Sequence, residues 1–357
     1  MKQNNIVENS SYNELQYHKN VLEDISYVKI ILILFVILGH SVAFWSGEWF
    51  TKNPELTVPI LSFMYSFLGS FHTYAFVILS GYIFSYKMAE GDYSDYKGFV
   101  YNKFKRLIVP YIFVSVVWVI PAAIFFMDYS MSDILLNFLL GINPHQLWFL
   151  LMLFFSFVFA WPIYKYVQGR YKLITLIGVL CYCVGVVGSN IIPNYFCIWN
   201  MMQYFLFFLI GIMLYGVKKE FFYKRKYIVF LGIMELFLLV FHIMIRKICT
   251  GLCLTIFQVV TNFGLHVVGS LFCICFAIYI IRKYINKQDK KNFNVSKYIM
   301  PVYLLHQQII YIVITLTNGC INPYISVVLC FVSSTVVSFV MSYFMLKNKF
   351  LRLCIGG

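Results

Sequence analysis

Residues 27–46 read YVKIILILFVILGHSVAFWS, and this stretch decides the fold class. A helix of about 20 mainly apolar residues spans the hydrocarbon core of a bilayer. Only Lys29 and His40 place ionisable groups within the stretch. It therefore predicts a transmembrane helix with two side chains that each require a partner or a function inside the membrane.

The rest of the chain has the same character. Of its 357 residues, 61% are apolar, 20% are aromatic and only 12% are charged, and the mean hydropathy is +0.78. Soluble domains carry about 25% charged residues, so a chain of this length could not cover a water-facing surface. The composition excludes a soluble enzyme and a disordered chain, and it predicts a polytopic membrane protein.

Hydropathy predicts an all-α membrane bundle of about ten transmembrane helices. The expected spans are 27–46, 58–84, 107–127, 146–164, 173–191, 199–217, 227–244, 263–281, 298–317 and 324–346. Residues 246–262 fit either a re-entrant or an interfacial segment. We expect a membrane domain over residues 26–346, between an N-terminal segment at 1–25 and a C-terminal tail at 347–357.

The basic residues predict how these spans are oriented. The chain carries 28 Lys and Arg against 14 Asp and Glu, a net charge of +14. If the N-terminus is cytoplasmic, all but four of the 28 lie on the inner side; Lys52, Arg246 and Lys247 lie outside, and Lys29 lies within the first span. This is the positive-inside pattern. We therefore expect both termini in the cytoplasm and the basic loops against anionic lipid headgroups rather than nucleic acid.

Lys29 and His40 are expected to share one face of the first span. Eleven residues correspond to about three helical turns plus 20°, and to about 16 Å along the axis. The two side chains cannot touch, but one elongated ligand could contact both. In the alternative interpretation, Lys29 extends to the inner headgroups and His40 is a hydrogen-bonded packing residue.

Two of the other histidines within predicted spans, His72 and His306, bear on the surroundings of His40. His72 is expected near the depth of His40, which suggests a polar pocket between consecutive helices. His306 lies about 12 Å into the ninth span. For each, the alternative is a structural histidine bonded to a backbone carbonyl.

Glu235 and His242, seven residues apart on one helical face, are the polar groups of the seventh span. They are either a buried acid facing the cationic pair Arg246-Lys247, or a structural anchor that holds this helix in place.

Lys103 and Arg106 stand immediately before the third span. Basic side chains at the mouth of a span suit a phosphate-bearing ligand. They equally suit lipid headgroups.

Five runs appear in the order typical of one family. They are Lys29 followed by ten positions and His40, Phe71-His72 leading to Ser80-Gly81-Tyr82, Lys103-Phe-Lys-Arg106 before Pro110-Tyr111, Leu147-Trp148-Phe149-Leu150, and Tyr303-Leu-Leu-His306. Together they resemble the acyltransferase 3 family of bacterial membrane O-acyltransferases, in particular its fucose 4-O-acetylase-like branch. The chain departs from the family pattern at Ser26, where Asp is usual, at Lys29, where most members have Arg, and at Thr73-Tyr74, which replaces an apolar residue followed by Pro.

The resemblance implies that an acetyl group moves from cytoplasmic acetyl-CoA to a sugar hydroxyl of a cell-surface polysaccharide or its lipid-linked precursor. It implies a multi-pass protein of the bacterial cytoplasmic membrane. His40 would be the general base, because a neutral imidazole can remove the proton of an attacking hydroxyl. Lys29, Lys103 and Arg106 would hold the anionic CoA.

The resemblance also implies a pocket around these groups. His72, Ser80 and Tyr82 would line it, orienting the acceptor or donating to the developing oxyanion, and Trp148 and His306 would complete the lining. No metal is implied, since these histidines lack carboxylate partners and the ten cysteines show no metal-ligand spacing.

Two other functions fit the intramembrane charges. A transporter of a polar metabolite or lipid-linked sugar would also carry them, but it predicts broken helices in two related halves, and no internal symmetry is evident. A non-catalytic membrane partner in glycan assembly is the third interpretation, which the departure at Ser26 keeps open.

Overall fold

The computed structural model describes residues 2–48, 54, 56–127, 129–167, 169–217, 219–285, 296–317 and 321–357. Of residues 2–20, 219, 220, 246, 247 and 252 it describes the backbone alone. Over these ranges the chain is mostly helical, with short turns between the helices, and contains no strand. The predicted all-α class is confirmed.

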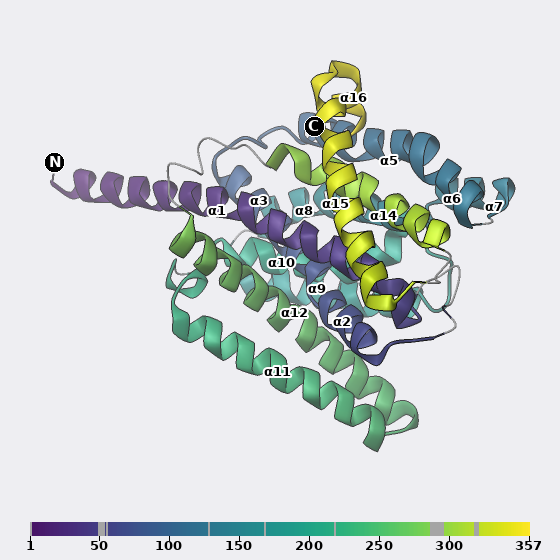
Figure 1. Cartoon of the computed structure of the whole chain (residues 1–357). Helices are drawn as coiled ribbons and strands as arrows, with labels where there is room; N and C mark the ends of the chain where they lie inside the picture. Colours follow the sequence, from purple (N-terminus) through teal and green to yellow (C-terminus); the bar gives the residue numbers. More distant parts are fainter. Residues whose placement is uncertain are drawn as a thin grey trace.

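Helices follow one another along the described chain with short connections (Figure 1). The α-helices are α1 (Lys2–Ser46), α2 (Pro59–Gly69), α3 (His72–Ala89), α4 (Tyr96–Lys103), α5 (Val109–Val114), α6 (Ile120–Met127), α7 (Met131–Leu140), α8 (Trp148–Val167), α9 (Tyr171–Gly188), α10 (Ile198–Leu214), α11 (Arg225–Ile248), α12 (Gly251–Tyr284), α14 (Ser296–Thr317), α15 (Pro323–Lys347) and α16 (Lys349–Cys354). Two π-helical segments, η1 (Phe104–Ile108) and η2 (Ser115–Val119), and three 3₁₀ turns, η3 (His145–Leu147), η4 (Tyr195–Cys197) and η5 (Lys219–Phe222), complete the order.

The described chain contains ten segments that are long and apolar enough to cross a membrane, as predicted. They are Val21–Ser46, Pro59–Ala89, Tyr96–Met127, Met131–Val167, Tyr171–Gly188, Tyr195–Leu214, Arg225–Ile245, Cys253–Tyr284, Ser296–Thr317 and Pro323–Lys347.

The structure corrects two details of this prediction. Residues 251–262 are not a re-entrant or interfacial piece, because they form the first turns of α12, which is 34 residues long. The second span is not one helix: α2 ends at Gly69, and α3 starts at His72 after a break at Ser70 and Phe71. Hydropathy could not reveal this break, since apolar residues continue on both sides of it.

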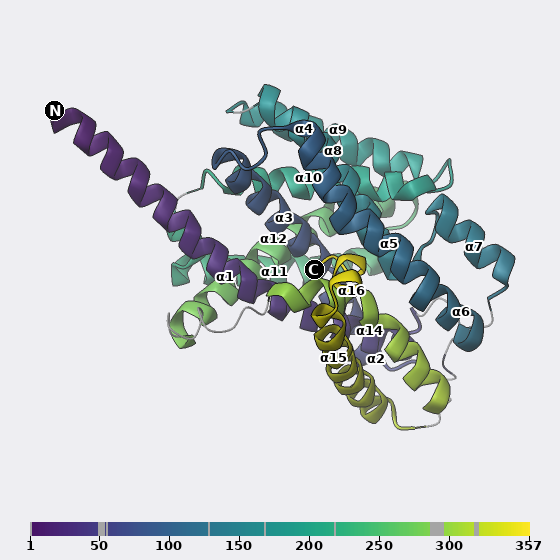
Figure 2. The same ribbon diagram turned by 90° about the horizontal axis from the view of Figure 1, so that it is seen from above.

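Helix α1 runs through the middle of the bundle and contacts α2, α3, α12, α14 and α15. Its N-terminal turns extend beyond the other helices, as Figure 2 shows. The carboxylate of Asp24, which is 2% exposed, accepts a 2.6 Å hydrogen bond from Arg282 of α12. A buried ion pair thus fixes α1 against α12 just before Lys29.

Glycines bring α3 and α10 into backbone contact. A Cβ on Gly81 would lie 2.0 Å from the carbonyl oxygen of Phe208, and one on Gly211 would lie 2.0 Å from that of Ile78. Small residues allow this approach where packing, rather than water exclusion, drives helix association. The contact fixes the position of α3, whose first residue is His72.

Candidate active site

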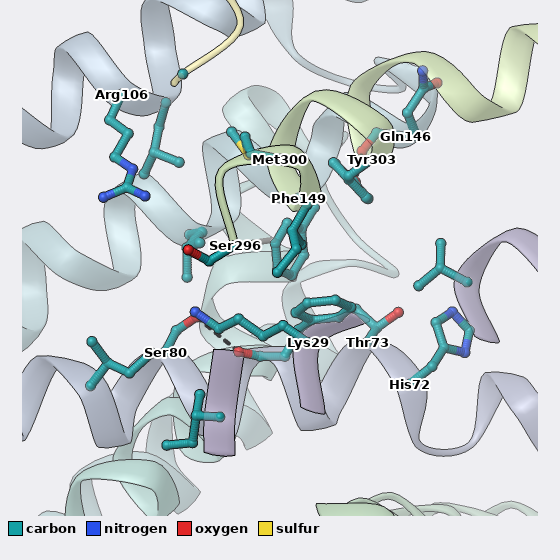
Figure 3. A pocket seen from close by; sticks show the side chains of 18 of the residues that line it. Lys29, His72, Thr73, Ser80, Arg106, Gln146, Phe149, Ser296, Met300 and Tyr303 are labelled. Carbon is teal, nitrogen blue, oxygen red and sulfur yellow. Dashed lines mark hydrogen bonds between the residues drawn. The ribbon is translucent and has the colours of Figure 1, made fainter. Parts of the chain in front are cut away.

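A cavity of about 780 Å³ lies between α1, α2, α3, η1, α8 and α14. Its lining contains seven of the side chains that the sequence singled out: Lys29, His40, His72, Ser80, Lys103, Arg106 and Trp148. Figure 3 shows several of them around the cavity. Lys29 and His40 therefore open into one space, as their shared helical face predicts.

Three histidines meet at one end of this cavity. The ring of His72 lies against α1, where a Cβ on Gly39 would be 3.8 Å from His72 Cε1. The rings of His40 and His306 have centroids 5.2 Å apart. His306 was predicted to line the cavity, and this prediction is wrong. Its side chain is fully buried and lies behind His40, outside the lining.

Backbone carbonyls determine the tautomers of two of these rings. His72 Nδ1 bonds the carbonyl oxygen of Leu68, and His306 Nδ1 bonds that of Tyr303 at 2.6 Å. Since a carbonyl can only accept, both Nδ1 atoms carry the proton, and both Nε2 atoms have a lone pair in the neutral rings. Within the described structure, His306 Nε2 is buried and has no hydrogen-bond partner.

Lys29, Lys103 and Arg106 supply the cations of the lining. Within the described residues no carboxylate forms an ion pair with any of the three. Because unneutralised charge near a membrane interior is costly, this cluster of cations is suited to an anionic ligand.

Aromatic residues hold Lys103 in place. Its Nζ lies 3.8 Å from the ring centroid of Phe157, and the rings of Tyr93 and Phe99 lie 5.0 and 5.4 Å away. Nζ also donates a 3.2 Å hydrogen bond to the hydroxyl oxygen of Tyr93. Burial raises the pKa of Tyr93, so this hydroxyl stays protonated and acts as a neutral acceptor. The aromatic rings therefore orient the ammonium without neutralising it.

The wall of the cavity includes Gln146, which the sequence reasoning missed. The side-chain amides of Gln146 and Gln308 exchange hydrogen bonds of 2.6 and 3.0 Å. The Tyr303 hydroxyl donates to the backbone oxygen of Gln146. The preceding residue, His145, has a left-handed φ of 48°. Backbone strain of this kind, about 1–3 kcal/mol, persists where the surroundings enforce it and often accompanies function.

Other lining residues also escaped prediction, chiefly Tyr65, Ser66, Thr73 and Tyr303. Thr73 adjoins His72 and Tyr303 lies three residues before His306, but neither position was singled out as a site residue. Tyr65 and Ser66 belong to α2, whose separation from α3 carried no sequence signal.

Tyr82 is corrected by the structure. It is 2% exposed, packs against the rings of Tyr215 and Phe222 with centroids 6.0 Å away, and does not line the cavity. Residues two apart on a helix project about 200° from each other. Ser80 and Tyr82 therefore could not both face the cavity from α3.

Glu235 and His242 lie away from the cavity lining, between α11 and its neighbours. His242 Nδ1 bonds Thr261 Oγ1 of α12 at 2.8 Å, and Glu235 Oε1 lies 3.4 Å from Ser70 Oγ. These contacts suit helix anchors. The side chains of Arg246 and Lys247, the cationic partner considered above, lie outside the described part of the chain.

A family model described as an acyltransferase domain matches residues 22–343. The chain belongs to the acyltransferase 3 family. The match covers the whole cavity lining except Gly356 and Gly357, so the cavity is a feature of the acyltransferase domain itself. No curated protein and no solved structure matches the chain.

Proposed function

We propose that this membrane acyltransferase transfers the acetyl group of acetyl-CoA to a sugar hydroxyl. One observation carries the proposal: a single cavity is lined by three cations without carboxylate partners and by the imidazoles of His40 and His72. An acyl-CoA offers phosphates for the cations and a thioester for the histidines. The acceptor that the family resemblance favours is a cell-surface polysaccharide or its lipid-linked precursor.

The donor would bind at the cationic end. The positive-inside pattern places Lys103 and Arg106 at the cytoplasmic face of a bacterial plasma membrane, where acetyl-CoA is available. Guanidinium and ammonium groups bind phosphate through charge-assisted hydrogen bonds. The pantetheine arm then extends along α1, over the roughly 16 Å that separate Lys29 from His40 on an ideal helix.

At the histidine end, His40 acts as the general base. The acceptor oxygen attacks the thioester carbonyl while its proton passes to the imidazole. When the tetrahedral intermediate collapses, the carbon–sulfur bond breaks and the proton moves from His40 to the departing CoA sulfur. His40 is thereby restored, and the products are the sugar ester and CoA.

The other two histidines support this step in different ways. His72 presents the Nε2 lone pair and so orients the acceptor by accepting a hydrogen bond, rather than by donating to the oxyanion. His306 lies behind His40 with an unused Nε2, whose lone pair can accept a hydrogen bond from an N–H of the His40 imidazolium as it forms. Ser80 donates to the Phe76 carbonyl at 2.8 Å, which leaves its lone pairs for the ligand.

Membranes from expressing cells, incubated with radiolabelled acetyl-CoA and candidate glycans, test the proposal. We expect labelled ester in the glycan fraction and its loss in His40→Ala, with unchanged membrane insertion. Transfer at the wild-type rate in that variant would refute the base assignment. Uptake of a sugar or metabolite into vesicles without ester formation would instead establish a transporter.

A further inference from the structure

The break between α2 and α3 positions His72, and no proline produces it. Sharp interruptions of a helix usually occur at Pro or at Gly/Ser pairs; residues 60–109 contain no Pro, and Gly69-Ser70 lies at the break. Phe71 leaves the helical region at φ −133° and ψ −32°, and His72 is the first residue of α3. The Gly69-Ser70 pair permits the break, but it does not by itself fix the orientation of α3 and His72.

Side chains of α12 supply hydrogen bonds at this point. In a continuous helix the Tyr74 N–H would donate to the Ser70 carbonyl; here His266 Nδ1 occupies that oxygen at 2.8 Å. Ser270 Oγ donates to the next carbonyl, that of Phe71, at 3.1 Å. Both carbonyls immediately before His72 thus receive a donor from a helix nearly 200 residues later in the chain, and the Phe71 carbonyl also keeps its helical bond from the Ala75 N–H at 2.8 Å.

The three α12 residues at this contact share one helical face. His266, Gly269 and Ser270 are spaced i, i+3 and i+4. A Cβ on Gly269 would lie 2.7 Å from Glu235 Oε1, so the carboxyl group of α11 fits against this glycine and reaches Ser70. The His266 ring is held in turn by stacking on Tyr74, with centroids 3.8 Å apart.

We propose that His266 and Ser270, braced by Glu235, are positioning residues that hold the α2–α3 break and thereby orient the imidazole of His72. The bond from His72 Nδ1 to Leu68 O spans the same break, because Leu68 belongs to the last turn of α2. If α2 moved relative to α3, this bond would be lost and the tautomer would no longer be fixed. The catalytic consequence rests on the function proposed above, whereas the positioning does not.

The test compares variants that remove or retain the donor at residue 266. His266→Leu removes it, and His266→Asn keeps an N–H at the position of Nδ1. Ser270→Ala removes the second donor with little change of volume. His242→Leu is the matched control, because it also removes a buried imidazole between α11 and α12 but lies outside the break.

The first readout does not depend on activity. In protein labelled with ¹⁵N-histidine, the His72 nitrogens are identified by their loss in His72→Gln, and their shifts report the tautomer. We expect the Nδ1–H form in wild type, His266→Asn and His242→Leu, and a mixture of tautomers in His266→Leu and Ser270→Ala. Unchanged His72 shifts in both of the latter variants overturn the proposal, whatever happens to activity.

The second readout separates kcat from KM. A displacement of about 1 Å at a reacting group can cost about 100-fold in rate, so we expect kcat of His266→Leu to fall by about 10- to 100-fold with the KM for acetyl-CoA unchanged. His266→Asn should recover most of this loss. If the wild-type protein transfers no acetyl group, the proposed function fails, and the nitrogen shifts alone decide whether α12 positions His72.

Discussion

The contact of α3 with α10 provides a sharp test of how the bundle positions the helix that carries His72. Replacing Gly81 by Ala would place a Cβ 2.0 Å from the Phe208 carbonyl oxygen. Carbon–oxygen contacts between helices lie at about 3.3–3.6 Å, so the two helices must separate by more than about 1 Å. The obstacle is backbone and cannot rotate away as a side chain would.

Two effects of Gly81→Ala are expected. Overpacking costs about 1–3 kcal/mol, so the protein in detergent should unfold at a lower temperature. Because α3 begins at His72, its displacement by about 1 Å should also lower kcat by up to about 100-fold. Thermal unfolding and the kcat for acetyl transfer, normalised to folded protein, measure the two effects separately.

Gly264→Ala is the matched control in another spanning helix. There a Cβ would lie 3.3 Å from Leu238 Cδ1, the end of a flexible side chain. Its stability and kcat should stay close to those of the wild type. If Gly81→Ala behaves like Gly264→Ala in both measurements, the close approach of α3 and α10 does not position His72.

Four further outcomes concern the cavity. Lys29→Ala should raise the KM for acetyl-CoA by about 10-fold or more, the loss of a charge-assisted contact, with kcat within twofold; unchanged kinetics would assign Lys29 to lipid anchoring. Tyr93→Phe should raise the KM for acetyl-CoA by only about two- to tenfold, since it removes one neutral hydrogen-bond acceptor from Lys103. If the variant and the wild type have equal KM values, the aromatic rings alone are enough to orient Lys103. His306→Phe should lower kcat with little change in KM, and an unchanged kcat would limit His306 to packing. Raising the salt concentration from 50 to about 500 mM should increase the KM for acetyl-CoA because the cations are screened; a KM independent of salt would argue against phosphate binding by them.

The sequence was sufficient for features that depend on local pattern. Long apolar stretches are enough to predict ten spans, and the interval between Lys29 and His40 predicts a shared face because helix geometry is regular over eleven residues. Polar groups within apolar spans identified Lys29, His40 and His72 of the cavity lining, since lipid penalises each of them, and the family resemblance added Ser80 and Trp148.

Features that depend on contacts between distant segments could not be predicted in this way. The break at Ser70 is held by His266 and Ser270. Nothing in the sequence around either residue distinguishes it from an ordinary polar residue of a spanning helix. The pairing of Gln146 with Gln308 likewise joins a loop and a helix that hydropathy treats independently. Tyr82 was misplaced because membership of a motif was taken to imply a common direction, although helix geometry separates it from Ser80.

Some polar groups within the described spans bond one another, whereas others line the cavity, and this contrast indicates what the cavity binds. His242 with Thr261, Gln146 with Gln308, and Asp24 with Arg282 bond one another inside the protein, so their burial needs no ligand. Lys29, Lys103 and Arg106 have no carboxylate partner among the described residues, and His72 of the lining keeps the lone pair of its Nε2 atom. Because such groups are costly without partners, we expect bound ligands to neutralise the cationic end of the cavity and to donate a hydrogen bond to His72 at the other end. A packing network requires no such combination, whereas an acyl-CoA bound together with a hydroxyl acceptor supplies both.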